Sequence, residues 1–370
     1  MVRDLMVKPW KAVEALVTRS VLIECDRIPY RFRNVPLKKI LNWILVEASM
    51  YARPERPWGW PTHLQIEPDA RCNLRCVICP VTTGMDRHTG SMEFRIFRKL
   101  IDQIGDYVFL ILLWDWGEPF LNPSIYDMIS YARGRGIKVV CSTNGQLLAK
   151  HEHAEEVIRS GLDTLIVAVD GISQQTYELY RQGGDLESVL EGIRKVVARK
   201  RQLNSARPLI NLRFLLMKHN EHEVPQLKDL AASLGVDVLT LKTLNPYGDH
   251  TELIPQNERY RRFTYTGEAQ APIRRRHNPC KQLWNMPAIH WNGTVALCTC
   301  DYDEKCGFGE LETDSFRDIW YGDAYRRIRH QFRSEWQSIP LCNACSYAYE
   351  GGSCIDEIIA EAHFFQPAGL

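Results

Sequence analysis

The chain has no apolar run long enough to span a membrane and almost no excess charge of either sign. A spanning helix needs about 20 consecutive, predominantly apolar residues, and no segment of this 370-residue sequence approaches that length. The N-terminus also lacks the compact apolar segment and cleavage site of a signal peptide, so we expect a cytoplasmic protein without a transmembrane segment. The formal net charge is only +1, which gives no reason to expect a nucleic-acid partner.

The sequence also lacks internal repeats and low-complexity tracts. Hydrophobic residues make up 45% and charged residues 25% of the chain, the ordinary balance of a globular protein. A chain of 370 residues can form two domains, or one α/β barrel with additional segments. Size and composition therefore allow an enzyme without indicating which kind.

Three segments differ in pattern. Residues 1–60 mix amphipathic helical segments with tryptophans and prolines, and we interpret them as an N-terminal helical extension. Residues 61–245 alternate short β-rich runs with longer segments of helical periodicity, which predicts parallel strands joined by crossover helices. Residues 246–370 begin with a polar, proline-containing linker and are rich in cysteine. The predicted strands are His63–Glu67, Phe109–Trp114, Lys138–Cys141, Thr164–Val169, Ile210–Leu216 and Val236–Leu241, and together they predict an α/β fold, a partial (β/α)6 TIM-like barrel.

Twelve cysteines are many for a cytoplasmic chain, where clustered thiols bind metals more often than they form disulfides. Cys72, Cys76 and Cys79 directly follow the first predicted strand, at the edge of a barrel where active sites are assembled. A 4Fe-4S cluster normally takes four thiolates, so three would leave one iron open to a cofactor or substrate. The alternatives are three buried cysteines, or a zinc site completed by a distant residue.

The segment Arg71–Pro80, which contains these cysteines, resembles the signature loop of the radical S-adenosylmethionine (SAM) superfamily. The resemblance implies that the open iron binds SAM and that one electron from the cluster cleaves it to a 5′-deoxyadenosyl radical, which takes hydrogen from a substrate. It also implies a low-potential electron donor such as flavodoxin or ferredoxin. Many members have an aromatic residue just before the third cysteine, where this chain has Ile78.

The same resemblance extends to the ends of later strands. The turn at 117–119 is similar to a Gly-Glu-Pro motif whose backbone and carboxylate receive the SAM ammonium, and the loop at 142–145 resembles the one beside the SAM ribose. Each is also a common turn sequence, and an arginine on a helix surface is the ordinary alternative for Arg181. The candidate SAM-binding residues are Gly117, Glu118, Pro119, Ser142, Asn144, Asp170 and Arg181.

Four C-terminal cysteines, Cys280, Cys298, Cys342 and Cys345, can ligate one metal centre. Taken alone, two cysteine pairs fit a zinc ribbon as well as an iron-sulfur cluster. With the N-terminal motif they resemble the SPASM and twitch class of radical SAM proteins, which implies a SPASM/twitch-like domain with an auxiliary 4Fe-4S cluster. The complete SPASM pattern has seven cysteines and two clusters, whereas Gly351 stands where a further ligand is expected. One auxiliary cluster, as in the shorter twitch arrangement, is therefore the prediction.

The other cysteines are interpreted first as small buried hydrophobic residues. A second interpretation is that one of Cys300, Cys306 and Cys354 donates a hydrogen atom to a substrate radical, as a radical epimerase requires. Further candidates near the expected mouth of the barrel are polar or aromatic: Asp115, Trp116, Asp301 and Tyr302.

The sequence thus favours dehydrogenation of a small-molecule or carbohydrate-type substrate, with the auxiliary cluster as electron acceptor. The first 60 residues show no peptide-binding winged-helix pattern, which disfavours a peptide substrate. The alternatives are a radical epimerase with a cysteine hydrogen donor, a peptide-modifying SPASM enzyme and, from another class, a non-catalytic zinc-binding scaffold.

Overall fold

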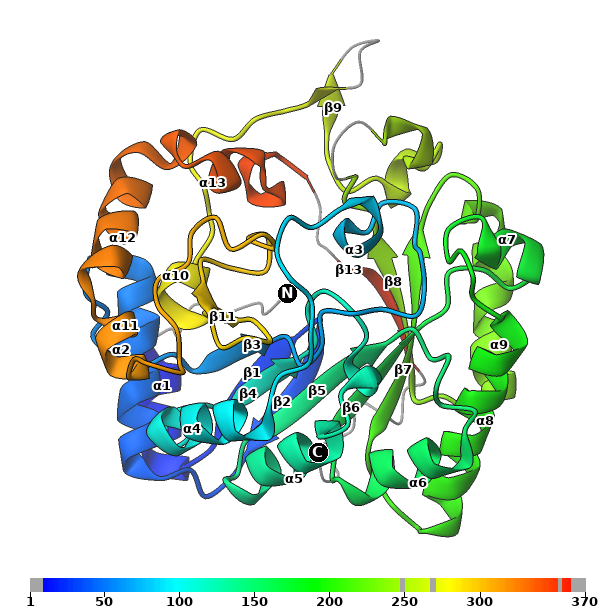
Figure 1. Cartoon of the computed structure of the whole chain (residues 1–370), viewed down its shortest axis with the longest axis horizontal. Helices are drawn as coiled ribbons and strands as arrows, with labels where there is room; N and C mark the ends of the chain where they lie inside the picture. Colours follow the sequence, from blue (N-terminus) through cyan, green and yellow to red (C-terminus); the bar gives the residue numbers. More distant parts are fainter. Residues whose placement is uncertain (1–8, 247–249, 267–270, 352–354, 361–370) are drawn as a thin grey trace.

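The computed structural model describes residues 9–246, 250–266, 271–351 and 355–360. Its centre is a sheet of nine strands in the order β12-β11-β3-β4-β5-β6-β7-β8-β13, which curves around the middle of the molecule (Figure 1). The six strands predicted from the sequence are all present, and each is parallel to its neighbour. They are β3 (His63–Ile66), β4 (Leu110–Leu113), β5 (Lys138–Thr143), β6 (Thr164–Ala168), β7 (Leu209–Leu216) and β8 (Val238–Thr243).

Helices between these strands cover the outer side of the sheet (Figure 1). Strands β3, β4 and β6 are buried along their whole length, as expected when helices cover one face and side chains fill the barrel on the other. Apolar residues recur along one side of the longer helices, for example Phe97, Leu100 and Ile104 of α4, and this side packs on the sheet. The helices on the outer side are α4 (Phe94–Ile104), α5 (Ile125–Gly134), α6 (His151–Arg159), α7 (Gln174–Glu178), α8 (Leu186–Gln202) and α9 (Leu227–Leu234), whereas the four-residue helix α3 (Pro80–Thr83) directly follows Cys79.

The N-terminal extension contains α1 (Pro9–Thr18) and α2 (Leu37–Ala52), as predicted. It also contains an antiparallel hairpin of β1 (Val21–Cys25) and β2 (Ile28–Phe32), which the sequence analysis did not predict. The hairpin packs against barrel residues such as Leu110, Val140 and Ile166. The hydroxyls of Tyr30 and Thr164 lie 2.8 Å apart, and Asp26 forms a buried ion pair of 2.6 Å with Arg213. The hairpin therefore closes the end of the barrel where the strands begin.

The C-terminal part extends the same sheet at both edges. Strand β11 (Ala288–Ile289) runs parallel to β3 and pairs with β12 (Val295–Ala296), while β13 (Ile355–Ala360) runs antiparallel to β8. The other elements are β9 (Tyr265–Thr266), β10 (Ala271–Pro272), α10 (Gln282–Asn285), α11 (Phe316–Trp320), α12 (Asp323–Glu335) and α13 (Pro340–Ala344), with 3-10 helices at Pro119–Leu121, Glu221–Gln226, Thr251–Leu253, Glu258–Tyr260, Trp336–Ser338 and Ser346–Ala348. Among the described residues, no helix is both long and apolar enough to cross a bilayer.

Candidate active site

Cys72, Cys76 and Cys79 lie together on the loop between β3 and α3. Apolar neighbours that include Leu74, Ile78, Tyr180, Met217 and Leu244 surround them. Two backbone hydrogen bonds hold this loop to the segment between α7 and α8. They run from Arg75 N to Gln182 O (3.0 Å) and from Val77 N to Tyr180 O (3.2 Å).

The thiols of this loop are close enough to affect each other's ionisation. Burial, together with the nearby Cys76, raises the pKa of both Cys72 and Cys79 to about 11. A ligating thiol is deprotonated, so binding of a metal must release protons here. Three mutually close thiols in an apolar, partly closed loop fit a 4Fe-4S cluster with one open iron.

Arg181 is directed toward this cysteine loop. Its Nε donates to Asp170 Oδ2 at 2.6 Å, and its other guanidinium nitrogen Nη1 lies 3.7 Å from Cys76 Sγ. Asp170 is 1% exposed and also accepts the backbone N–H of Leu215 at 2.8 Å. Arg181 is therefore not an ordinary surface arginine: it places a positive charge beside the cysteine loop, and Asp170 holds it there.

The Gly117–Pro119 turn packs against the segment that leads into Cys72. Gly117 has a φ of +102°, and a Cβ at this position would lie 2.1 Å from the carbonyl oxygen of Asp69, so only glycine fits. Glu118 N donates to Arg71 O at 2.7 Å. The turn is thus part of the support of the cysteine loop.

The Glu118 carboxylate is 1% exposed and is occupied by other protein groups. Its Oε1 accepts the Thr143 hydroxyl at 2.7 Å and the Phe120 N–H at 3.2 Å, and its Oε2 accepts the Asn144 N–H at 2.8 Å. Burial raises its pKa, and these three donors oppose that shift. The carboxylate therefore holds the loop after β5, and contact of this carboxylate with SAM stays a prediction.

The loop after β5 reaches the cysteines through Asn144. The Asn144 side-chain amide donates to Asn73 Oδ1 at 2.7 Å and lies 3.7 Å from Cys72 Sγ. Ser142 is half-buried, two residues before it. The structure therefore brings the motifs of four consecutive strand ends together around Cys72–Cys79, and the binding of SAM by these residues stays a prediction.

The four predicted auxiliary cysteines line one cavity of about 340 Å³. Burial and the nearby Cys345 and Cys300 raise the pKa of Cys280 to about 12, so these thiols also lie close together. A fifth cysteine, Cys300, lines the same cavity, and contact with the Cys298 thiol holds its pKa below the ordinary value. The donors present fit an iron-sulfur cluster, and the structure adds Cys300 to the thiols available to it.

The remaining cysteines lie elsewhere. Cys306 is half-buried and does not line the cavity, whereas Cys25 and Cys141 are buried in the hydrophobic core, as expected of small apolar residues. Cys354 lies outside the described residues.

Asp115 and Trp116 line the cavity that the auxiliary cysteines share with Ile78 of the catalytic loop. Asp115 Oδ1 accepts the Thr299 hydroxyl, while its Oδ2 is buried with no hydrogen-bond partner among the described residues. Burial raises the pKa of Asp115 to about 7. A carboxyl group with this pKa can take up or release a proton near neutral pH, and a catalytic role for Asp115 stays a prediction.

The other two predicted mouth residues do not line the cavity. Asp301 is fully buried, and its carboxylate accepts the N–H of Cys306 at 3.0 Å; the expectation that it lies at the mouth was wrong, because it instead holds its own loop. Tyr302 packs edge-on against Trp116, with ring centroids 5.6 Å apart, so it touches the cavity wall from behind.

A buried polar network that the sequence analysis missed joins the barrel to the C-terminal part. Glu67, at the end of β3, forms an ion pair of its Oε2 with Arg87 at 2.9 Å, and the two side chains are 0% and 6% exposed. Arg87 also donates to the carbonyl of Tyr302 and lies 3.7 Å from Glu304, which pairs with His290 at 3.0 Å. This network joins the end of β3 to the segment that follows Cys300.

Family models match two parts of the chain. Residues 66–231 match the radical SAM superfamily, and they include the cysteine loop and the strand-end motifs around it. This chain is therefore a member of the radical SAM superfamily. Residues 280–346 match the SPASM iron-sulfur cluster-binding domain. More particularly, the chain is a SPASM-type radical SAM enzyme. The radical SAM domain implies a catalytic 4Fe-4S cluster and SAM as cofactors, and the SPASM domain implies auxiliary iron-sulfur clusters. The zinc-scaffold alternative is set aside.

The chain is similar to several known proteins. It is 27% identical, over 77% of its length and 87% of the relative's, to a tungsten-containing aldehyde ferredoxin oxidoreductase cofactor-modifying protein of Pyrococcus furiosus. It is also 27% identical, over 80% and 91% of the two chains, to an AdoMet-dependent heme synthase of Methanosarcina barkeri. The crystal structure of Streptococcus suis SuiB bound to S-adenosylmethionine superposes with a TM-score of 0.58 at 16% identity, over 87% of this chain and 83% of that one, which shows a shared fold.

Proposed function

We propose that this enzyme dehydrogenates a small anionic substrate, which is either a carbohydrate or another small molecule. The observation that carries the proposal is the single cavity that touches both Ile78 of the catalytic loop and the auxiliary cysteines. A substrate in this cavity would lie between the two cluster sites. When bound, the clusters and SAM supply one-electron chemistry, which removes a hydrogen atom from a substrate carbon and accepts one further electron.

The proton that must also leave the substrate has a candidate acceptor in Asp115. Loss of one hydrogen atom, one electron and one proton removes two hydrogens in total and forms one new double bond, so atoms and charge balance. Asp115 lines the cavity, and a pKa of about 7 lets its carboxylate accept a proton near neutral pH. The Thr299 hydroxyl fixes the orientation of the carboxylate.

Two cations of the cavity that have no carboxylate partner among the described residues favour an anionic substrate, although Asp26 and Asp115 also line it. Arg213, Lys242 and Arg262 line it, and only Arg213 forms an ion pair with a carboxylate among the described residues, namely Asp26. Arg262 donates to the Ser346 hydroxyl at 3.3 Å. Lys242 and Arg262 could therefore bind a carboxylate or phosphate group of the substrate.

The relatives, by their known activities, also support a small molecule. They include cofactor-modifying and heme-synthase proteins and a probable GTP 3′,8-cyclase. The neighbour bound to a precursor peptide is the specific reason to keep a peptide substrate as an alternative. A flavodoxin or ferredoxin as electron donor stays a prediction.

Radical epimerisation is the second candidate, and Cys300 is the observation that favours it. It lines the substrate cavity and is not one of the four cysteines assigned to the auxiliary cluster. A thiol there could return a hydrogen atom to a substrate radical. Neither Cys306, which does not line the cavity, nor the undescribed Cys354 has this support.

The first experiment is anaerobic reconstitution followed by iron and sulfide analysis. Two 4Fe-4S clusters predict about eight irons per chain. Cys72→Ala/Cys76→Ala/Cys79→Ala should retain about four irons and form no 5′-deoxyadenosine, whereas Cys342→Ala/Cys345→Ala should retain about four and still cleave SAM. About four irons in the unaltered protein would refute the auxiliary cluster.

The second experiment separates the candidate reactions. The enzyme is incubated in D2O with SAM, dithionite and panels of phosphorylated sugars, carboxylated small molecules and short peptides. Loss of two hydrogens from a small anionic molecule supports dehydrogenation. Deuterium in a recovered substrate of unchanged formula supports epimerisation instead, and activity on peptides alone would refute the small-molecule proposal.

A further inference from the structure

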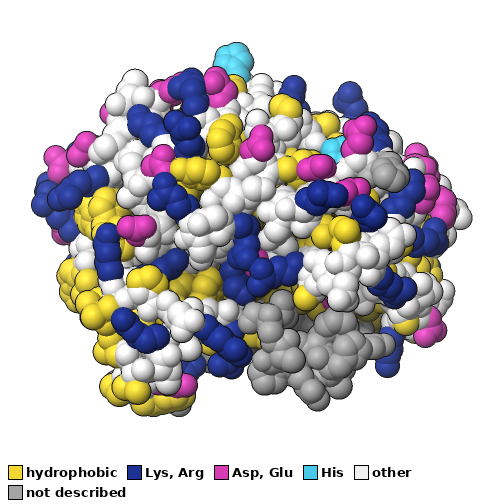
Figure 2. Space-filling view, turned by 90° about the horizontal axis from the view of Figure 1, so that it is seen from below, with side chains coloured by type: hydrophobic (Ala, Val, Ile, Leu, Met, Phe, Trp, Pro, Cys, Tyr) yellow, Lys and Arg dark blue, Asp and Glu magenta, His cyan; other side chains and the backbone are white. Residues whose placement is uncertain are grey.

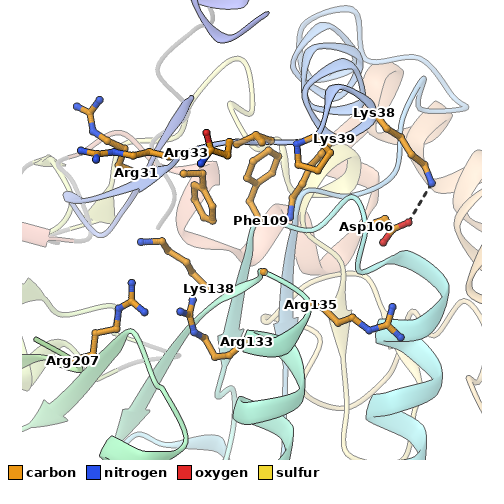
Figure 3. Close-up of a pocket in the computed structure, with 15 residues that line it drawn as sticks. Arg31, Arg33, Lys38, Lys39, Asp106, Phe109, Arg133, Arg135, Lys138 and Arg207 are labelled. Carbon is orange, nitrogen blue, oxygen red and sulfur yellow. Dashed lines mark hydrogen bonds and ion pairs between the residues drawn. The ribbon is translucent and has the colours of Figure 1, made fainter. Parts of the chain in front are cut away.

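A second cavity, of about 620 Å³, is lined by residues at the end of the barrel where the strands begin, among them Lys138 at the start of β5 (Figure 3). Eight of its fifteen lining residues are lysine or arginine, and one, Asp106, is acidic. The basic side chains come from β2 and the residues after it, α2, the end of α5, the start of β5 and the segment before β7. Figure 3 shows Arg31 and Arg33 on one side of the hollow and Lys138, Arg133 and Arg207 on the other.

Four of these eight cations have carboxylate partners. Lys38 pairs with Asp106 at 3.3 Å, Arg135 with Asp102, and Arg133 and Arg207 share Asp163 at 3.0 and 3.6 Å. The other four, Arg31, Arg33, Lys39 and Lys138, form no ion pair within the described part of the chain. The cavity thus holds a surplus of positive charge.

Two of the unpaired cations are buried. Lys39 and Lys138 are each 6% exposed. The Lys39 ammonium lies 4.7 Å from the Phe109 ring centre, and that of Lys138 lies 5.3 Å from the Phe32 ring centre. Burial lowers the pKa of Lys39 to about 8 and also lowers that of Lys138, while Asp106 and Asp163 respectively oppose these shifts. Contact with a ring compensates only part of the cost of burying a charge, so a bound anion would stabilise both ammonium groups.

An exposed apolar surface lies beside this cavity. On α1 and α2, which pack together, six large apolar side chains are 44–77% exposed. Their spacings of three, four and eight residues put them on one face of each helix, and the set on α2 begins next to Lys38. Figure 2 shows hydrophobic side chains gathered on the left of this face and lysine and arginine near its middle. The apolar stripe is Trp10, Val13, Val17, Leu37, Leu41 and Leu45.

The combination identifies one kind of partner. An acidic electron-transfer protein would have to reach the clusters, but the basic cavity and the cysteine loop lie at opposite ends of β5. Lys138 of the cavity begins this strand, whereas Asn144, which lies beside Cys72, follows its other end. A strand of six residues separates them by about 20 Å. A nucleic acid or free nucleotide would use the cations but leave the apolar stripe exposed. Apolar side chains next to unpaired cations instead match a membrane interface with anionic lipids.

We propose that this face docks on an anionic phospholipid surface, with headgroup phosphates in the basic cavity and the apolar stripe in the interface. Docking would leave the end of the barrel that carries the cysteines directed away from the lipid. The inference does not depend on the proposed dehydrogenation, because it concerns the opposite end of the barrel.

The test is anaerobic sedimentation of the holoenzyme with vesicles of phosphatidylcholine alone or with one third phosphatidylglycerol. Binding should require phosphatidylglycerol and weaken with salt. Arg31→Gln/Arg33→Gln and Leu41→Gln/Leu45→Gln should each lower the partition coefficient about tenfold or more. The matched control is Lys228→Gln/Arg333→Gln, which removes the same charge from exposed positions on α9 and α12 and should change binding by less than about twofold.

All variants should keep their iron content and 5′-deoxyadenosine formation, because none touches the cysteine sites. Equal binding to both vesicle types, or an equal loss in the control, would overturn the proposal. A further experiment measures the binding of soluble glycerol phosphate. If glycerol phosphate binds saturably to the cavity and the protein does not bind vesicles, the ligand is a free phosphate and membrane docking is refuted.

Discussion

Glu118 offers a sharp test of how the catalytic loop is held. Its carboxylate accepts three hydrogen bonds, from Thr143, Asn144 and Phe120, at 2.7, 2.8 and 3.2 Å. In Glu118→Gln one oxygen remains, and the new NH2 group must face one of these donors. If the amide oxygen replaces Oε1, the Asn144 N–H loses its acceptor.

The expected loss follows from the number of donors left unpaired. One buried donor without a partner costs about 1–3 kcal/mol, so Glu118→Gln should lower the free energy of unfolding by about 2 kcal/mol. Glu118→Ala leaves all three donors unpaired and should cost about 4 kcal/mol or more. Because Asn144 lies 3.7 Å from Cys72 Sγ, both variants should also lose iron to a chelator faster than the unaltered enzyme.

Urea unfolding of the metal-free protein and the rate of iron release measure these effects. Glu335→Gln is the matched control, because Glu335 is exposed and its change should stay within about 0.5 kcal/mol. If Glu118→Gln unfolds at the same urea concentration and holds its iron, but binds SAM more weakly, the bracing role is refuted and direct contact with SAM is supported.

Three further predictions concern the rest of the site. Burial raises the pKa of Asp115 to about 7, so folding favours its protonated form, and its contribution to stability is lost as the pH rises through 7. Relative to Asp115→Asn, the unaltered protein should therefore become easier to unfold with urea as the pH rises from 5 to 8. Parallel plots of unfolding free energy against pH for the two proteins would contradict the shift. Arg87→Gln strands the buried Glu67 carboxylate and should cost about 3–5 kcal/mol, whereas adding Glu67→Gln should recover part of that loss; an additive double variant would show that the pair does not interact. Gly117→Ala would place a Cβ 2.1 Å from Asp69 O and should lower both iron content and 5′-deoxyadenosine formation, and a normal iron content in this variant would show that the turn can move.

Sequence pattern predicted the barrel because its determinants are local. The six strands are short runs that are buried and mostly apolar or β-branched, with Leu110–Leu113 as the most apolar example, and they alternate with segments that have helical spacing. The cysteine loop was predicted because three thiols at close spacing demand a chemical explanation. Arg181 and Asn144 were named from the resemblance, and the structure places both beside these thiols. The division into residues 1–60, 61–245 and 246–370 stays a prediction.

What the sequence did not predict depends on distant partners. Glu67 and Arg87 are ordinary charged residues until the fold buries them together with Glu304. The hairpin at Val21–Phe32 was missed because its short strands stand between two amphipathic helices, whose periodicity dominated the interpretation of this segment. The resemblance assigned Glu118 a ligand contact, and only the folded structure reveals that three protein donors already occupy its carboxylate.

The hairpin that closes the barrel also sets an order of events during synthesis. Asp26 emerges from the ribosome 187 residues before its partner Arg213, a delay of about 10–40 s at ordinary elongation rates. Until then the apolar side of the hairpin has no complete barrel to cover, because β7 and β8 do not yet exist. We therefore expect co-translational help from a chaperone to matter at the hairpin, Val21–Phe32, until its barrel partners have been synthesised.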